Sequence, residues 1–77
     1  MILRILTPAS SEEHRAEAVF LPGASGAFEV LPGHAPIISA LEAGSIRWRD
    51  AGREQSVPLD GGMVMVRNDV ITVCIEG

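Results

Sequence analysis

A chain of 77 residues has room for one domain, and a domain of this size buries only about 60% of the surface that its unfolded chain exposes. Its ten acidic and six basic residues give a net charge of −4, so the phosphates of nucleic acids and the head groups of anionic lipids would repel it. The sequence contains no lysine, which excludes Schiff-base catalysis, a phosphate-loop lysine and the lysine-bearing hairpin of lipoyl and biotinyl carrier domains.

The pattern along the chain predicts short β-strands. Fourteen valines and isoleucines stand against six leucines, and β-branched side chains favour a pleated sheet. No segment between the turn signals is long enough for a normal helix, and the close spacing of the turns is typical of a sandwich or barrel. The turn signals are Thr7-Pro8, Pro22-Gly23, Pro32-Gly33, Ala43-Gly44, Asp50-Ala51-Gly52, Asp60-Gly61-Gly62 and Arg67-Asn68-Asp69.

Alternation of apolar and polar residues predicts which side chains face the core. It is clearest in residues 3–5, 16–20 and 46–49, where apolar residues alternate with Arg4, with Glu17, and with Arg47 and Arg49. The core positions predicted in this way are Leu3, Ile5, Ala16, Ala18, Phe20, Ile46 and Trp48.

Two segments carry signals of a sheet edge. Pro58 interrupts the predicted strand 55–59 and cannot donate a hydrogen bond to a neighbouring strand, so it indicates an edge or a bulge. The charged run 12–15 is most simply a solvated edge that discourages unwanted strand pairing.

The last two predicted strands are apolar on both sides. Met63 and Met65 alternate with valines, and residues 70–75 are apolar except at Thr72. Such strands lie either in the middle of a sandwich or under a binding partner. Met63 and Met65 share one face, either as adaptable core filler or as a contact surface. Cys74 is expected to be a small buried hydrophobic residue. Because it is the only cysteine in the sequence, an internal disulfide is excluded.

No residue pattern predicts a catalytic or metal site. His34 lies in a loop stiffened by prolines, and Ser39 with Glu42 or Glu29 would be its partners in an acyl-transfer site, but no nucleophile elbow surrounds the serine. His14 and His34 are far apart, without a second cysteine or paired-ligand spacing, so we expect no metal and no cofactor.

The chain is also expected to be soluble. Its uninterrupted apolar runs are far shorter than the roughly 18 residues that a membrane-spanning helix needs, and no signal peptide is recognisable at its start. We therefore expect no direct membrane insertion. A thin core without disulfides or metal leaves a protein partner as the expected source of additional stability.

Three blocks of sequence stand out, namely residues 1–8, residues 26–36 continuing to Ile46, and residues 59–66 continuing through 68–73. They cover nearly the whole chain in order, and the string Leu-Pro-Gly-His-Ala-Pro at 31–36 is the most specific part of them. Together they resemble the N-terminal β-domain of the epsilon subunit of F-type ATP synthases.

The resemblance implies one domain over residues 1–77, a flattened antiparallel β-sandwich of about ten short strands. It also implies a non-catalytic rotor subunit of the central stalk, which links the gamma subunit to the c-ring and couples proton translocation to ATP synthesis. Two neighbouring loops would form one polar patch against the polar loops of the c-ring, whereas Met63 and Met65 would contact gamma. The implied c-ring contacts are Ala27, Phe28, Glu29, Gly33, His34 and Ala35.

The sequence departs from the family pattern at two points. Family members often read Gly-Glu-apolar-Gly where this chain has residues 26–29, so the usual acidic side chain is missing at Ala27 and one stands at Glu29 instead. Many members also continue into a pair of C-terminal helices that can inhibit ATP hydrolysis, whereas this sequence ends at Gly77. If the chain is complete, that inhibition is absent; a shortened version of a longer protein would end in much the same place.

The resemblance further implies a peripheral location at the cytoplasmic face of the bacterial inner membrane, within the synthase complex. Two alternatives remain open from the residues alone. An unrelated small all-β protein-interaction module would share the composition, and a small enzyme built around His34 is the third and weakest interpretation.

Overall fold

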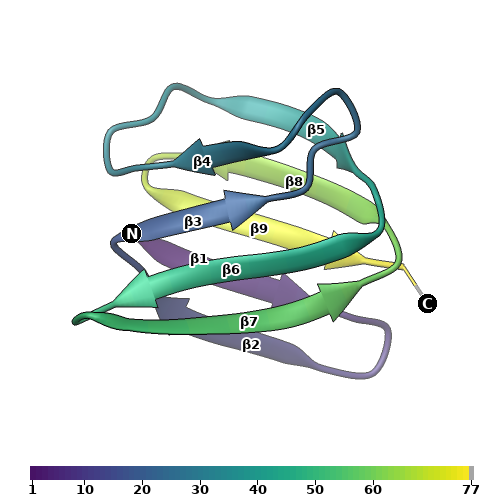
Figure 1. Cartoon of the computed structure of the whole chain (residues 1–77), viewed down its shortest axis with the longest axis horizontal. Coiled ribbons are helices and arrows are strands. Elements are labelled where there is room, and N and C mark those ends of the chain that lie inside the picture. Colours follow the sequence, from purple (N-terminus) through teal and green to yellow (C-terminus); the bar gives the residue numbers. More distant parts are fainter. Residues whose placement is uncertain (77) are drawn as a thin grey trace.

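The computed structural model describes residues 1–76, which form a sandwich of two β-sheets (Figure 1). No stretch of these residues forms a helix that could cross a membrane. The strands are β1 (Ile2–Leu6), β2 (Ser11–Arg15), β3 (Ala18–Leu21), β4 (Phe28–Val30), β5 (Ile37–Leu41), β6 (Gly44–Asp50), β7 (Arg53–Leu59), β8 (Gly62–Arg67) and β9 (Val70–Ile75). The predicted all-β sandwich is confirmed, with nine strands in the described residues where about ten were expected.

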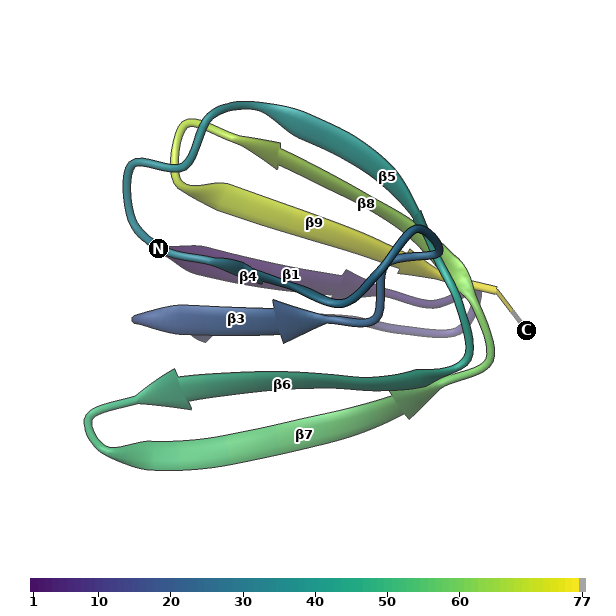
Figure 2. The ribbon, with the colours of Figure 1, turned by 45° about the horizontal axis from the view of Figure 1, so that its top comes forward.

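The larger sheet has the strand order β2-β1-β9-β8-β5, and the smaller sheet has the order β4-β3-β6-β7. Figure 2 shows the two sheets as separate layers, with β6 and β7 below β5, β8 and β9. Neighbouring strands are antiparallel except β1 and β9, which pair in parallel with Ile2 opposite Val70. The predicted antiparallel sandwich thus has one parallel pair, where the first and last strands run in the same direction through the middle of one sheet.

The inner faces of the two sheets share one hydrophobic core. Trp48 on β6 is the largest of the fully buried side chains, and Leu3 and Ile5 on β1 lie in the opposite layer. The predicted core positions in residues 3–5 and 46–49 are thus confirmed. The fully buried large side chains are Leu3, Ile5, Val19, Leu21, Val30, Ile46, Trp48, Val64, Val66, Ile71 and Val73.

In β3, the large side chains that face the core are one residue away from the position predicted by the alternation. Val19 and Leu21 face the core, whereas Phe20 lies on the outer face and is only half-buried. The guanidinium of Arg47 covers its ring, with Cζ 4.9 Å from the ring centroid, so a cation–π contact replaces burial in the core. Ala16 and Ala18 are buried as predicted, but a row of small and large apolar residues at 18–21 leaves the phase of the strand ambiguous in the sequence.

The edge strands β2 and β7 are largely polar, as predicted from the charged run and from Pro58. His14 is the one residue of β2 that is not exposed. Its ring packs on the indole of Trp48, with the ring centroids 4.6 Å apart. Its Nε2 lies 3.0 Å from Oε1 of Glu12. The indole N–H of Trp48 is buried without a hydrogen-bond partner among residues 1–76, so this corner of the core depends on ring packing rather than on hydrogen bonds.

Replacement of Trp48 by alanine should remove most of the stability of so small a core. We expect Trp48→Ala to lower the free energy of unfolding by about 3–5 kcal/mol, because it leaves a cavity that the sheets cannot close. Ser45→Ala, on the exposed face of the same strand, should change it by less than about 0.5 kcal/mol. Urea unfolding followed by circular dichroism measures both, and equal effects at the two positions would contradict the assignment of the inner face.

Candidate protein-binding surfaces

The outer face of the larger sheet is apolar over β5, β8 and part of β9. Ile38 is 71% exposed, Met63 45% and Met65 48%. The strand register places Ile38 opposite Met65 and Ala40 opposite Met63, so these four side chains lie side by side on one face. On the other side of β8, Met63 lies opposite Cys74. We call these five residues the apolar face.

A groove of about 420 Å³ runs along one end of the apolar face. Ile38 and Met65 line it together with Pro36 at the start of β5 and Arg67 at the end of β8. Such a groove would accept an apolar side chain of a partner, and the methionine thioether adapts its shape to what it contacts. The arginine supplies one charge at the rim of the groove.

Cys74 is exposed, which contradicts the expectation that it is a buried hydrophobic residue. Its neighbours Val73 and Ile71 take the core-facing positions of β9, so Cys74 falls on the outward phase. In a strand where adjacent residues are all apolar, the sequence does not show which side chains point to the core and which point outward. Met63 and Met65 are not core filler, because both side chains are nearly half exposed on the outer side of β8.

The outer face of the smaller sheet is charged. Arg47 and Arg49 project from β6, and Glu54 on β7 lies 3.4 Å from the guanidinium of Arg47. Both partners of this ion pair are about half exposed, so the pair contributes little to stability. The outer face of the smaller sheet thus carries charged side chains, whereas the larger sheet presents apolar side chains over β5, β8 and part of β9.

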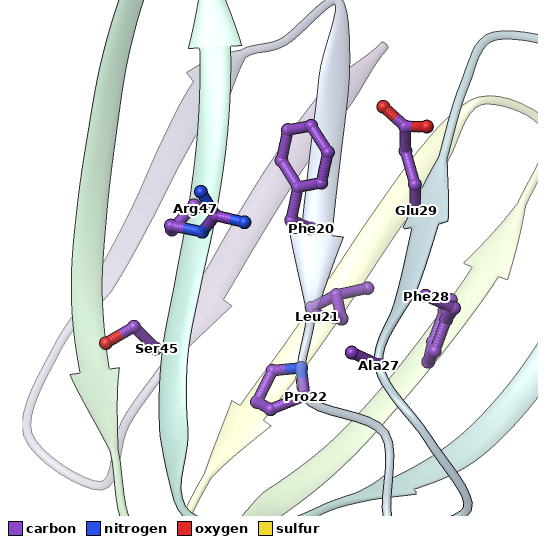
Figure 3. A pocket seen from close by; sticks show the side chains of 8 residues that line it. All are labelled: Phe20, Leu21, Pro22, Ala27, Phe28, Glu29, Ser45 and Arg47. Carbon is purple, nitrogen blue, oxygen red and sulfur yellow. The ribbon is translucent and has the colours of Figure 1, made fainter.

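Three of the predicted c-ring contacts gather at a depression of about 300 Å³ beside β3 and β4. Figure 3 shows Ala27, Phe28 and Glu29 along one side of it and Phe20, Pro22 and Arg47 across from them, with the Phe28 ring turned away from Phe20. Ala27 and Glu29 are exposed, and Phe28 is partly buried against the core. The full lining is Phe20, Leu21, Pro22, Ala27, Phe28, Glu29, Ser45 and Arg47.

The loop before β4 fits under Phe28 because Gly23 has no side chain. A Cβ at Gly23 would lie 2.5 Å from the carbonyl oxygen of Gly26 and 2.9 Å from the Phe28 ring. The same segment is tied to β5, since the N–H of Ala24 donates to the carbonyl oxygen of Ala40 at 2.9 Å. This side of the depression is therefore fixed by backbone contacts between the two sheets.

The other three predicted contacts, Gly33, His34 and Ala35, lie in the exposed loop between β4 and β5. This loop and the loop before β4 are at opposite ends of β4 (Figure 1). The expectation that they are neighbours forming one polar patch is wrong, because residues 28–30 form a short strand between them. The six residues instead follow the side of the sandwich where β4 borders one sheet and β5 borders the other.

His34 is not arranged for acyl transfer. Its Nδ1 donates to the carbonyl oxygen of Ala35 at 2.7 Å, and the hydroxyl of Ser39 donates to the carbonyl oxygen of Ala40 at 3.1 Å. Each member of the supposed pair is thus bonded to backbone of its own segment. Within residues 1–76, no three His, Cys, Asp or Glu residues are grouped so that they could hold a metal ion.

Ile38 and Asp69 are the residues that the sequence did not identify. Ile38 is the most exposed large apolar side chain among the described residues, and the doublet Ile37-Ile38 was its only signal, since one of two adjacent strand residues must face outward. Asp69 was recognised only as part of a turn signal. In the structure its carboxylate binds the backbone of the loop that carries His34.

The structure defines a small all-β domain, a sandwich of two sheets without a metal cluster among residues 1–76. Within that class, the chain belongs to the family of the ATP synthase delta/epsilon chain, beta-sandwich domain, whose model matches residues 1–77. It is 38% identical over 75 residues to the ATP synthase epsilon chain of Desulfitobacterium hafniense (strain DSM 10664 / DCB-2), which covers 96% of this chain and 57% of that protein. It is also 38% identical over 78 residues to the ATP synthase epsilon chain of Prochlorococcus marinus (strain MIT 9303), covering 100% of this chain and 59% of that protein.

Two solved structures share the fold. One is a chain of the Euglena gracilis mitochondrial ATP synthase, OSCP/F1/c-ring in rotational state 1, with a TM-score of 0.89 at 19% identity over 97% of this chain and 49% of that chain. The other belongs to the central stalk/c-ring of the Tetrahymena thermophila mitochondrial ATP synthase, with a TM-score of 0.79 at 10% identity over 99% of this chain and 63% of that chain. At these identities the likeness shows the fold, and the chain spans less than three-fifths of the curated relatives just described.

Proposed function

We propose that this domain is a non-catalytic part of the central stalk of an F-type ATP synthase, where it links the gamma subunit to the c-ring and so couples proton translocation to ATP synthesis. Membership of the delta/epsilon family supports the assignment. The observation that carries the docking part of the proposal is the apolar face, with Ile38 71% exposed and both methionines nearly half exposed.

The apolar face is the gamma-binding surface in this proposal. Isolated apolar residues on a surface are ordinary, but Ile38, Met63 and Met65 are contiguous in the strand register and border a groove. A partner that covers them removes apolar area from water without any rearrangement of the sandwich. The charged outer face of the smaller sheet offers no comparable area.

The side of the sandwich that carries β4 and β5 faces the polar loops of the c-ring in this proposal. It includes Ala27, Phe28 and Glu29 at the depression and Gly33, His34 and Ala35 in the loop. Because these groups lie at opposite ends of a short strand, the contact would be a strip along this side rather than a single point. Anchoring through gamma and the ring would hold the domain at the cytoplasmic face of the bacterial inner membrane, in keeping with its bacterial relatives.

Charge placed on the apolar face should abolish binding to gamma. In the double variant Met63→Glu and Met65→Glu, binding of gamma would bury two carboxylates without partners. The affinity for the gamma subunit of the same synthase should therefore fall about a hundredfold or more, so that the two proteins no longer co-purify. The domain should stay folded, because both side chains are exposed. Ser45→Glu with Ser56→Glu is the matched control on the charged face and should bind normally. Equal binding by both double variants would refute the assignment.

Photocrosslinking tests the orientation toward the c-ring. Cysteines at Glu29 and at His34, introduced into a Cys74→Ser chain and labelled with a photoreactive maleimide, should crosslink to the polar loop of the c-subunit in the assembled synthase. A cysteine at Glu13 is the control, because β2 is the edge of the larger sheet opposite to β5. If Glu13→Cys reaches the c-subunit and neither of the other positions does, the domain is oriented the other way.

A further inference from the structure

The side chain of Asp69 connects the loop of residues 31–36 to the β8–β9 hairpin of the larger sheet. The backbone N–H of Gly33 donates to Oδ1 of Asp69 at 2.8 Å, across a separation of 36 residues. Asp69 lies in the two-residue turn between β8 and β9, the hairpin that also carries Met63 and Met65. Figure 1 shows this turn and the β4–β5 loop at the same end of the sandwich.

The loop presents this N–H outward because of its turn geometry. The N–H of His34 donates to the carbonyl oxygen of Leu31 at 3.1 Å, and Gly33 has φ +82°. A type II β-turn needs a left-handed residue at its third position and often has proline at its second, and residues 31–34 have both. In such a turn the N–H of the third residue has no partner within the turn, so it is available to an outside acceptor.

The acceptor is itself held in place by the backbone. Asn68 and Asp69 have φ values of 51° and 61°, the left-handed conformation that a two-residue hairpin turn needs and that these two residue types tolerate. The carbonyl oxygen of Asp69 accepts a hydrogen bond from the N–H of Ile2 at 3.0 Å. The carboxylate therefore extends from a fixed point, where three segments of the chain meet.

We propose that Asp69 is a positioning residue: its carboxylate fixes the loop of residues 31–36 against the β8–β9 hairpin and so holds His34 at a constant place relative to the apolar face. What the loop and the apolar face would contact rests on the proposed function, whereas the anchoring itself does not. In a rotor subunit, this hydrogen bond would join the ring-facing loop to the gamma-facing strands by a path that bypasses β5. Without it, the exposed loop would keep its own turn but lose its attachment to the hairpin.

Amide hydrogen exchange of Gly33, measured by NMR on the 77-residue chain, tests the anchor directly. Asp69→Gly keeps the left-handed turn and removes the acceptor, so the exchange rate at Gly33 should rise about tenfold. Residue 69 is not a sequence neighbour of Gly33, so the intrinsic exchange rate is unchanged and any difference is structural. Asp69→Asn keeps an acceptor oxygen and should retain most of the protection.

Asn68→Gly is the matched control, because it alters the same turn without touching the carboxylate. The proposal predicts that this variant leaves exchange at Gly33 as in the unchanged chain. It is overturned if Asp69→Gly leaves the exchange unchanged, if Asn68→Gly accelerates it equally, or if Asp69→Asn exchanges as fast as Asp69→Gly. Co-purification with gamma is measured alongside. Failure of the unchanged chain to bind gamma would refute the proposed function and leave the anchor standing.

Discussion

A β-strand has two sides, and in a sandwich of two sheets only one of them can face the core. About half of the side chains in the nine described strands must therefore point outward whatever their chemistry. The smaller sheet meets this constraint with charge, as at Arg47 and Glu54. The larger sheet does so over β1 and β2, as at Arg4 and Glu13. Over β5 and β8, Ile38, Met63 and Met65 remain in contact with water. Full burial of such a side chain is worth about 1.5–3 kcal/mol, so a partner covering these partly exposed residues gains binding energy at no cost in folding.

The apolar face depends on strands from both ends of the chain. β9 lies between β1 and β8, so the middle of the larger sheet is built from the first and the last strands. Such non-local pairing has a high entropic cost of closure and forms late compared with hairpins. The apolar face therefore exists in its complete form only after the C-terminal strand has been inserted. The same arrangement brings Asp69, Ile2 and Gly33 together at one end of the sandwich.

Much of the fold could be predicted from the sequence because it depends on local chemistry. Alternation placed Leu3, Ile5, Ile46 and Trp48 in the core, and Pro58 identified an edge. Where the residues on both sides of a strand are apolar, the sequence pattern does not show which side faces the core. That is why Phe20, on the outer face under Arg47, was assigned to the core, and why Cys74 was expected to be buried.

The candidate surfaces were predictable in part. The shared face of Met63 and Met65 follows from their spacing, but its exposure depends on which strands pair, and so does the contribution of Ile38 from β5. The c-ring contacts were inferred from a resemblance and stay a prediction. Their separation into two groups could not be foreseen, since a strand of three residues between two loops that contain proline and glycine has no clear signal of its own. The bond between Asp69 and Gly33 joins residues with no local relation at all.

The reactivity of Cys74 tests the central claim that gamma covers the apolar face. This thiol is the only one in the chain, it is exposed, and it lies opposite Met63 on that face. Its rate of alkylation by N-ethylmaleimide should fall strongly when the gamma subunit of the same synthase is bound. In a Cys74→Ser chain with Ser45→Cys on the charged face, the rate should stay the same with and without gamma. If gamma binds and Cys74 reacts as fast as in the free chain, the apolar face is not where gamma docks.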